Sequence, residues 1–250
     1  MLFDLIKFII VRTFRKNRET QQTHISGLPP QPYYDPSCFD VTDLNSAKAI
    51  ILTPEGSSTE ERWQNETPLV VENIIKECGP TNEHVILDFG CGIGRIAREL
   101  IDNTGAFVIG VDISSSMCRL AVDYVANDSR FVCVSPSALD VLIDRGLRVD
   151  AAYSVWVLQH CSEPEIEIAR IRSALKPGGK LHVVNNLYRA VPTSAGWADD
   201  SKDIRNLLSE LFEETNYFHF QEESIPQAVR QFTYCATYER TQDSERMSEI

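Results

Sequence analysis

The 250-residue sequence predicts an α/β fold with a doubly wound, mostly parallel sheet and helices on both faces. Two stretches carry this prediction. The apolar run Val85 to Phe89 is followed by three glycines at alternate positions and then by a helical pattern. A second apolar run, Phe107 to Val111, ends in Asp112 and also leads into a helical pattern. Strands that alternate with helices build a parallel sheet, which binds its ligands at the carboxyl ends of the strands.

The spacing of the glycines narrows the kind of nucleotide ligand. The dinucleotide-binding fingerprint is G-x-G-x-x-G, whereas Gly90, Gly92 and Gly94 alternate, and Arg95 stands where the last dinucleotide glycine would be. Glycines adopt backbone angles closed to other residues and let main-chain N–H groups approach a ligand. Taken alone, this loop is also compatible with a tight strand-to-helix turn that binds nothing.

Asp112 lies about 20 residues after the glycine loop, where a carboxylate can accept hydrogen bonds from both ribose hydroxyls of a nucleotide. The alternative role is a cap for the next helix. Ser114 or Ser115 can provide that cap instead, so we interpret Asp112 as a ribose-binding residue.

With Asp88 included, the loop reads D-x-G-x-G-x-G and resembles motif I of the class I S-adenosylmethionine-dependent methyltransferases. Asp112 matches the motif II acid, Val149 to His160 resembles motif IV, and Leu175 to Lys180 resembles the family's L-K-P-G-G turn. The motifs follow the family's order, within a resemblance that covers residues 58–239. The resemblance implies a seven-stranded sheet with an antiparallel last strand, S-adenosylmethionine as cofactor and methyl transfer as the activity.

The resemblance also implies which residues contact the cofactor. The glycine loop would hold its methionine and ribose parts, with Asp88 near the amino end. Family members often carry an acid after the third strand, bound to the adenine amino group, but here serines stand in its place and the more distant Asp140 is a less favoured substitute. The implied cofactor contacts are Asp88, Gly90, Cys91, Gly92, Gly94, Asp112, Ile113, Met117, Ser135, Ser137, Ser154 and Val155.

In the family, the end of the motif IV strand faces the transferred methyl group and the acceptor. His160 is the candidate general base because an imidazole titrates near neutral pH, and a structural role is its favoured alternative. Arg62 and Trp63 are candidates for the cofactor's carboxylate or for the acceptor, or else a solvated arginine and a core tryptophan. The candidate acceptor contacts are Trp63, Trp156, Gln159, Asn185 and Tyr188.

Composition limits the function classes. A net charge of −12 argues against a long nucleic-acid interface, which needs a basic face. The seven cysteines show neither C-x-x-C pairs nor zinc spacing, so we expect no metal site and a reducing cytoplasm. The acidic charge and an aromatic arm favour a small or medium-sized metabolite as acceptor. A protein substrate and a non-catalytic scaffold with this fold are the alternatives, and the glycine spacing disfavours an NAD-dependent oxidoreductase.

We expect three parts in the chain: an amphipathic segment and lid over residues 1–57, the cofactor-binding domain over 58–240, and a polar tail over 241–250. In residues 1–18 an apolar run precedes a basic cluster, the reverse of a signal peptide. This segment could lie on an anionic membrane surface. Packing against the domain or a second subunit is the favoured alternative.

The local patterns predict the remaining elements. A capping box of Ser58 and Glu61 starts a helix, a second helix starts at Pro68, and Ser162 with Glu165 caps a later one. Further helices are expected over residues 43–52, 115–126 and 201–214, a loop over 192–200, and strands over 131–134, 181–184, 217–222 and 231–239.

Overall fold

The computed structural model describes residues 32–241, which form a seven-stranded sheet in the order β3-β2-β1-β4-β5-β9-β8. The first five strands pair in parallel, and β9 runs antiparallel to both of its neighbours. The predicted mostly parallel, seven-stranded sheet is therefore confirmed. The strands are β1 Val85–Phe89, β2 Phe107–Val111, β3 Phe131–Val134, β4 Val149–Val155, β5 Leu175–Asn186, β8 Glu213–Phe218 and β9 Thr233–Glu239.

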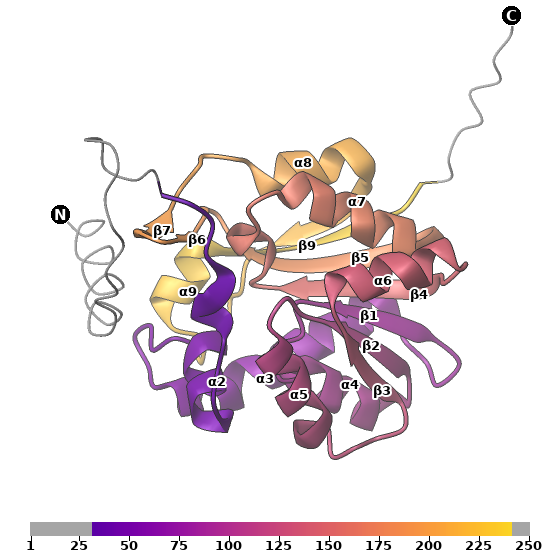
Figure 1. Ribbon diagram of the computed structural model, residues 1–250, viewed down its shortest axis with the longest axis horizontal. Helices are drawn as coiled ribbons and strands as arrows, with labels where there is room; N and C mark the ends of the chain where they lie inside the picture. Colours follow the sequence, from indigo (N-terminus) through magenta and orange to yellow (C-terminus); the bar gives the residue numbers. More distant parts are fainter. Residues whose placement is uncertain (1–31, 242–250) are drawn as a thin grey trace, which may run out of the picture.

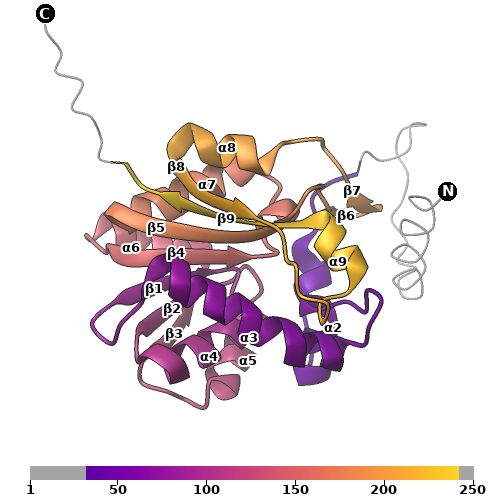
Figure 2. The same cartoon turned by 180° about the vertical axis from the view of Figure 1, so that it is seen from behind.

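Helices cover both faces of the sheet (Figures 1 and 2). Successive strand residues point to opposite faces, so Ile86 packs in the apolar cluster under α3, α4 and α5, and Leu87 in the cluster under α6, α7 and α8. Each strand of the central sheet is thus apolar on both sides, as a buried parallel sheet requires. The helices are α3 Thr59–Cys78, α4 Arg95–Thr104, α5 Ser115–Tyr124, α6 Pro136–Asp144, α7 Pro164–Ala174 and α8 Ile204–Leu211.

The remaining short elements gather beyond one end of the sheet, at the left of Figure 1. They are η1 Pro36–Phe39, α2 Leu44–Ile51, η2 Leu158–His160, the hairpin strands β6 Val191–Thr193 and β7 Gly196–Ala198, and α9 Gln227–Phe232. We call residues 33–52 the arm. Tyr34 of the arm forms a β-bridge with Thr193 of the hairpin. Leu52 of the arm is buried in a third apolar cluster with Trp63 and Met117.

The arm is also tied by hydrogen bonds to the loop after β2. Asp40 accepts a hydrogen bond from the Ser114 hydroxyl at 3.1 Å, and the Val41 N–H donates to the Ser116 hydroxyl at 2.9 Å. The arm therefore bridges the hairpin and the β2–α5 loop across the carboxyl ends of the strands.

The predicted helix start at Pro68 is wrong, because α3 runs without interruption from Thr59 to Cys78. Pro68 has no N–H to donate to the carbonyl of Gln64. Both residues lie on the exposed face of the helix, where water can take up the freed carbonyl. The cost of the proline is thereby reduced, while Val70, Val71 and Ile74 remain buried on the opposite face.

Boundaries after motif IV also differ from the prediction. Pro164 begins α7 after Glu163, and no side chain caps this helix, so the predicted Ser162–Glu165 cap is wrong. Residues 192–200 hold the hairpin instead of a plain loop, and β8 begins at Glu213 within the stretch predicted as helix. β8 is an edge strand of mixed polarity, so its sequence gives no clear apolar alternation. The predicted contacts of residues 1–18 lie outside the described residues, and the three-part division of the chain stays a prediction.

Candidate functional site

The three loop glycines are required by both conformation and space. Gly90, Gly92 and Gly94 have φ of 80°, 53° and 79°, which is the left-handed region that other residues avoid. A Cβ on Gly90 would lie 2.2 Å from a Val157 methyl carbon, and one on Gly92 would lie 2.9 Å from Ile51. The three glycines thus leave the main chain of this turn without side chains at these positions. Ile51 of the arm and Val157 after β4 pack against it.

Asp112 stands at the end of β2 and is half-buried. Its two oxygens accept the N–H groups of Gly92 at 2.8 Å and Ser114 at 2.9 Å. The helix cap is provided by the Ser114 hydroxyl, which accepts the Met117 N–H at 3.3 Å. Burial raises the pKa of Asp112, and the two N–H bonds oppose that rise. Each carboxylate oxygen keeps acceptor capacity, so Asp112 can still bind hydroxyls of a ligand.

Asp88, at the end of β1, is a buried acid whose Oδ2 has no hydrogen-bond partner among residues 32–241. Burial raises the pKa of Asp88 to about 7. A buried polar atom without a partner costs free energy, which a ligand cation or N–H group would recover. The Cys91 sulfur, in contrast, lies 3.5 Å from the Cys133 sulfur, so the main chain of Cys91 is the part that a ligand at the loop can contact.

The segments beyond Asp112 are open to solvent. Ile113 is 53% exposed, and Ser135 and Ser137 are exposed as well. Ser135 caps α6 by accepting the Ala138 N–H at 3.2 Å. Asp140 accepts hydrogen bonds from Arg170, at 2.6 Å to Nε, so it is already engaged in an ion pair. The Met117 side chain is buried under the arm.

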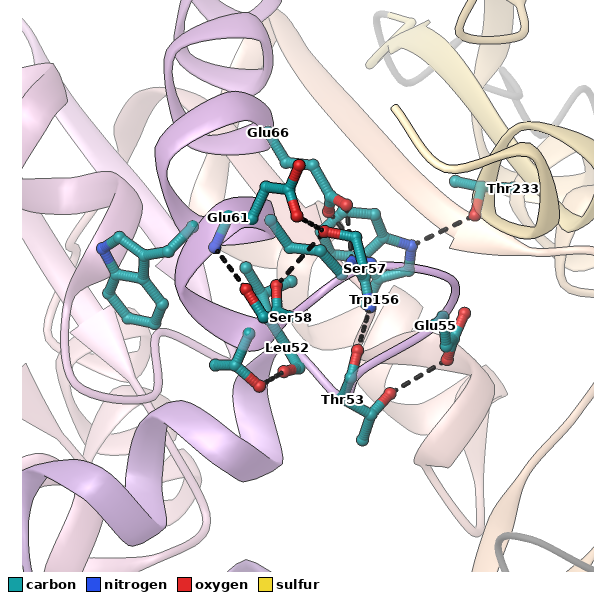
Figure 3. A network of polar contacts seen from close by, with 12 residues as sticks. Leu52, Thr53, Glu55, Ser57, Ser58, Glu61, Glu66, Trp156 and Thr233 are labelled. Atoms are coloured by element: carbon teal, nitrogen blue, oxygen red, sulfur yellow. Dashed lines mark hydrogen bonds and ion pairs between the residues drawn. The ribbon is translucent and has the colours of Figure 1, made fainter. Parts of the chain in front are cut away.

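The end of β4 carries backbone strain. Trp156 has a φ of 56°, unusual for a bulky residue, and its indole nitrogen lies 3.4 Å from the Thr233 hydroxyl (Figure 3). The preceding Ser154 is buried with a hydroxyl that has no partner among the described residues, and Val155 is half-buried. Strained residues of this kind concentrate at functional sites, where the surrounding structure holds them.

Two of the candidate acceptor contacts, Gln159 and Asn185, are hydrogen-bonded to each other. The Gln159 N–H donates to Asn185 Oδ1 at 3.2 Å, and Gln159 Oε1 accepts the Asn186 N–H at 3.2 Å. Gln159 and Asn185 are both buried, so they tie the loop after β4 to the end of β5. Tyr188 is half-buried against Phe232 with ring centres 5.9 Å apart, and burial raises its pKa to about 12.

His160 forms an aromatic cluster with Phe39 of the arm and Trp197 of the hairpin, with ring centres 5.8 Å and 5.2 Å from its own. Its Nδ1 lies 2.6 Å from the Ala190 carbonyl, which assigns the proton to Nδ1. Burial lowers the pKa of His160 to about 4, so the imidazole is neutral and a weak base at pH 7. The sequence gives no signal for Trp197, because the short β6–β7 hairpin that positions it has the pattern of a loop.

The depressed pKa of His160 predicts a pH effect on stability. Between pH 4 and pH 6.5 the unfolded imidazole binds a proton that the folded one excludes, so the free energy of unfolding falls as pH is lowered through this range. Above pH 6.5 the contribution of the neutral His160 to the free energy of unfolding is fully retained. His160→Gln should therefore lose less stability than the wild type between about pH 7 and about pH 5 in urea unfolding. Equal losses would contradict the assignment; His182, also with a pKa near 4, is common to both proteins.

Arg95, which stands where the dinucleotide fingerprint has its last glycine, is buried beside the loop. Its guanidinium centre lies 5.5 Å from the ring centre of Trp63 and 5.8 Å from that of Trp156. Arg62 is also buried, but it is paired with Glu66 through bonds of 2.5 Å and 2.9 Å. The structure thus brings two of the candidate acceptor contacts, both tryptophans, together around one cation.

Two negative findings apply to residues 32–241. No group of three or more histidine, cysteine or acidic side chains in this part of the chain is placed to hold a metal ion. Within the same residues, no helix combines the length and the apolar character needed to cross a bilayer.

Known proteins share the segment that builds this site. Residues 86–179 match the family model described as a methyltransferase domain. Phosphoethanolamine N-methyltransferase 2 of Caenorhabditis elegans is 37% identical over 113 residues, which are 43% of this chain and 25% of that protein. Residues 86–179 are thus a methyltransferase domain, with the motifs of the class I S-adenosylmethionine-dependent family. N-demethylindolmycin N-methyltransferase of Streptomyces griseus is 39% identical over 108 residues, which are 42% of this chain and 45% of that protein.

The fold agrees with solved methyltransferases. The N-methyltransferase NodS from Bradyrhizobium japonicum, solved with S-adenosylhomocysteine, is similar with a TM-score of 0.58 at 14% identity, over 78% of this chain and 97% of that one. At this identity the likeness concerns the fold. The chain spans a quarter to about half of the length of the two curated relatives, 25% and 45%.

The residues present suit the family's cofactor, S-adenosylmethionine. The bare main chain of the glycine loop can lie against it, Asp112 can accept ribose hydroxyls, and the unpartnered Oδ2 of Asp88 can accept from its ammonium group. The individual contacts, including those of Ser135 and Ser137, stay predictions.

Proposed function

We propose that this methyltransferase moves a methyl group from S-adenosylmethionine to a small or medium-sized metabolite by in-line displacement. The observation that carries the proposal is the joint placement of Asp88, the glycine loop and Asp112 at the carboxyl ends of adjacent strands. When bound, the cofactor supplies a sulfonium methyl that is already activated for displacement, so no metal ion is needed. The protein's part is to orient the reactants and exclude water.

The arm and the hairpin support a small acceptor. They meet through the Tyr34–Thr193 bridge and the contact of Phe39 with Trp197, whose ring centres lie 6.2 Å apart. An arm fastened to both the hairpin and the β2–α5 loop leaves little room for a polymer. The proteins named phosphoethanolamine and N-demethylindolmycin N-methyltransferase are relatives whose names also indicate small acceptors.

The chemistry of His160 favours an acceptor that is nucleophilic without help. A base with a pKa of about 4 is too weak to deprotonate a hydroxyl effectively at neutral pH. We therefore infer an acceptor with a neutral amine or a comparably strong nucleophile. The cysteines of the chain are free thiols, including Cys91 and Cys133, which supports a reducing cytoplasm as its location.

Thermal unfolding with S-adenosylmethionine, S-adenosylhomocysteine and NADH, each added separately, tests the cofactor. A ligand at 100 times its Kd stabilises by about 2.7 kcal/mol, which raises the unfolding temperature by several degrees. We expect shifts with the two adenosyl-sulfur ligands and none with NADH. Methyl transfer to a panel of small amines then tests the reaction. No shift with any ligand would overturn the proposal, and binding without transfer to any acceptor class would favour a scaffold.

A further inference from the structure

Cations and indole rings alternate in a stack of side chains next to the glycine loop. The Lys48 ammonium nitrogen lies 5.0 Å from the ring centre of Trp63, and the Arg95 guanidinium centre lies 5.5 Å from the same ring. The ring centre of Trp156 lies 5.8 Å from Arg95 and 5.7 Å from the guanidinium centre of Arg62. Each distance is within the range of a cation–π contact. We call these five residues the cation–indole stack.

The stack joins segments that are far apart in the sequence. Lys48 belongs to α2 of the arm, and Trp63 belongs to α3. Arg95 is the first residue of α4, and Trp156 directly follows β4. Trp63 is 9% exposed, because arm residues pack with it in one apolar cluster. Trp63 is therefore the member of the stack that lies between the arm and Arg95.

Arg95 keeps its charge in this buried place. It is 3% exposed, and burial lowers its pKa to about 10, while the carboxylates of Glu66 and Asp88 oppose that fall. Its Nη1 donates to the Thr67 hydroxyl at 3.0 Å, and this hydroxyl donates to the Trp63 carbonyl at 2.5 Å. A cation–π contact is stronger where water is excluded. At pH 7 Arg95 is thus a fixed cation in contact with two indole rings.

Trp156 needs support because its backbone is strained. A φ of 56° is unfavourable for a bulky residue and persists only where the surrounding structure holds it. Its indole N–H donates to the Thr233 hydroxyl at 3.4 Å, which is a long hydrogen bond (Figure 3). The two guanidinium groups supply the other contacts of the ring described here. Trp156 lies at the carboxyl end of β4, where folds of this kind bind their ligands.

We propose that Trp63 is a positioning residue for the acceptor: through Arg95 it holds the Trp156 ring in one orientation at the acceptor side of the site. This inference rests on the proposed function. Trp63 acts from a buried place, which differs from the direct acceptor contact expected from the sequence. Its π-face is the property that matters, because an aliphatic side chain fills space but does not attract a cation. Without that attraction Arg95 is free to move away from Trp156.

Fluorescence quenching tests this link without any ligand. The chain has three tryptophans, so replacing Trp63 and Trp197 leaves Trp156 as the one indole fluorophore. The proteins to compare are Trp63→Phe/Trp197→Phe, which keeps a ring in the stack, and Trp63→Leu/Trp197→Phe, which does not. We expect acrylamide to quench Trp156 about twofold more strongly in the Leu protein, because the Trp156 ring is then less firmly held. Equal quenching in the two proteins would overturn the inference.

Leu120→Ala, made in the Phe protein, is the control. Leu120 packs against the same apolar cluster as Trp63, so its truncation loosens the packing but leaves the stack complete. It should leave the quenching of Trp156 unchanged, whereas a merely structural Trp63 predicts that Leu120→Ala and Trp63→Leu act alike. Arg95→Met in the Phe protein removes the cation instead of the ring. It should raise the quenching as Trp63→Leu does, and it tests the same link if Trp63→Leu does not fold.

Methyl transfer to an acceptor found in the amine panel tests the consequence for the reaction. Trp63→Leu should lower kcat/KM for the acceptor by about 10-fold, the scale of one desolvated cation–π contact, and Trp63→Phe by less than about threefold. The Kd of S-adenosylhomocysteine should stay within about threefold of the wild type in both variants. Equal losses of kcat/KM in the two variants would overturn the inference. Failure of S-adenosylhomocysteine to stabilise the wild type would overturn the proposed function instead.

Discussion

Gly90→Ala is expected to lower the free energy of unfolding by about 2–5 kcal/mol and to abolish cofactor binding. A left-handed backbone costs a residue with a Cβ about 1–2 kcal/mol. The new methyl would also lie 2.2 Å from Val157, and overpacking of this kind costs about 1–3 kcal/mol. Urea unfolding measures the loss of stability, and calorimetry with S-adenosylhomocysteine measures binding.

Gly178→Ala is the matched control for this prediction. Gly178 has a φ of 76°, close to the 80° of Gly90, but nothing beyond its own chain neighbours lies within 4 Å of where its Cβ would be. It should therefore lose only the conformational part, about 1–2 kcal/mol, and bind the cofactor normally. Adding Val157→Ala should recover part of the loss in Gly90→Ala and none in Gly178→Ala. Equal losses in the two glycine variants would contradict the packing argument.

Asp112→Ala is expected to weaken cofactor binding by about 10- to 100-fold. Removing a buried acceptor from a hydrogen-bonded ligand costs about 1–3 kcal/mol, and each 1.4 kcal/mol is about tenfold in Kd. The substitution also strips the Gly92 and Ser114 N–H groups of their acceptor, which loosens the glycine loop. Calorimetry with S-adenosylhomocysteine measures the change in Kd.

The control is Asp140→Ala. Asp140 is the other acid considered for the nucleoside, but it is held by Arg170 through bonds of 2.6 Å and 3.2 Å. Its removal should leave the cofactor Kd within about twofold of the wild type. An unchanged Kd in Asp112→Ala, or a large change in Asp140→Ala, would make the ribose assignment wrong.

The parts of this protein that sequence reasoning predicted well are those encoded locally. The glycine turn follows directly from residues 90–94, and β1 and β2 follow from short apolar runs. The helix cap at Ser114 was one of two serines considered, and the hydrogen bond to Met117 decides between them. The number of strands and the antiparallel last strand required the family resemblance, because local patterns do not say which strands are neighbours.

What sequence reasoning missed depends on contacts between distant segments. Arg95 shows no sign of burial on its own, since it is buried by Trp63 of α3 and Trp156 after β4. Gln159 and Asn185 resemble site contacts in sequence, and only the fold shows that their polar atoms bind main chain and each other. Polar residues near a site are ambiguous until their hydrogen bonds are known.

The fastening of the arm has a consequence for the order of events in turnover. Ile51 occupies the space that a Cβ on Gly92 would need. Asp40 accepts a hydrogen bond from the hydroxyl of Ser114, and the N–H of the same serine donates to the Asp112 carboxylate. We therefore expect the spent cofactor to leave only after the arm has detached from the β2–α5 loop. Since the same arm is joined to the hairpin, we expect one opening step to govern the exchange of both reactants. In such an enzyme the opening of the arm would limit the turnover rate, and the chemical step would be faster than the release of the products.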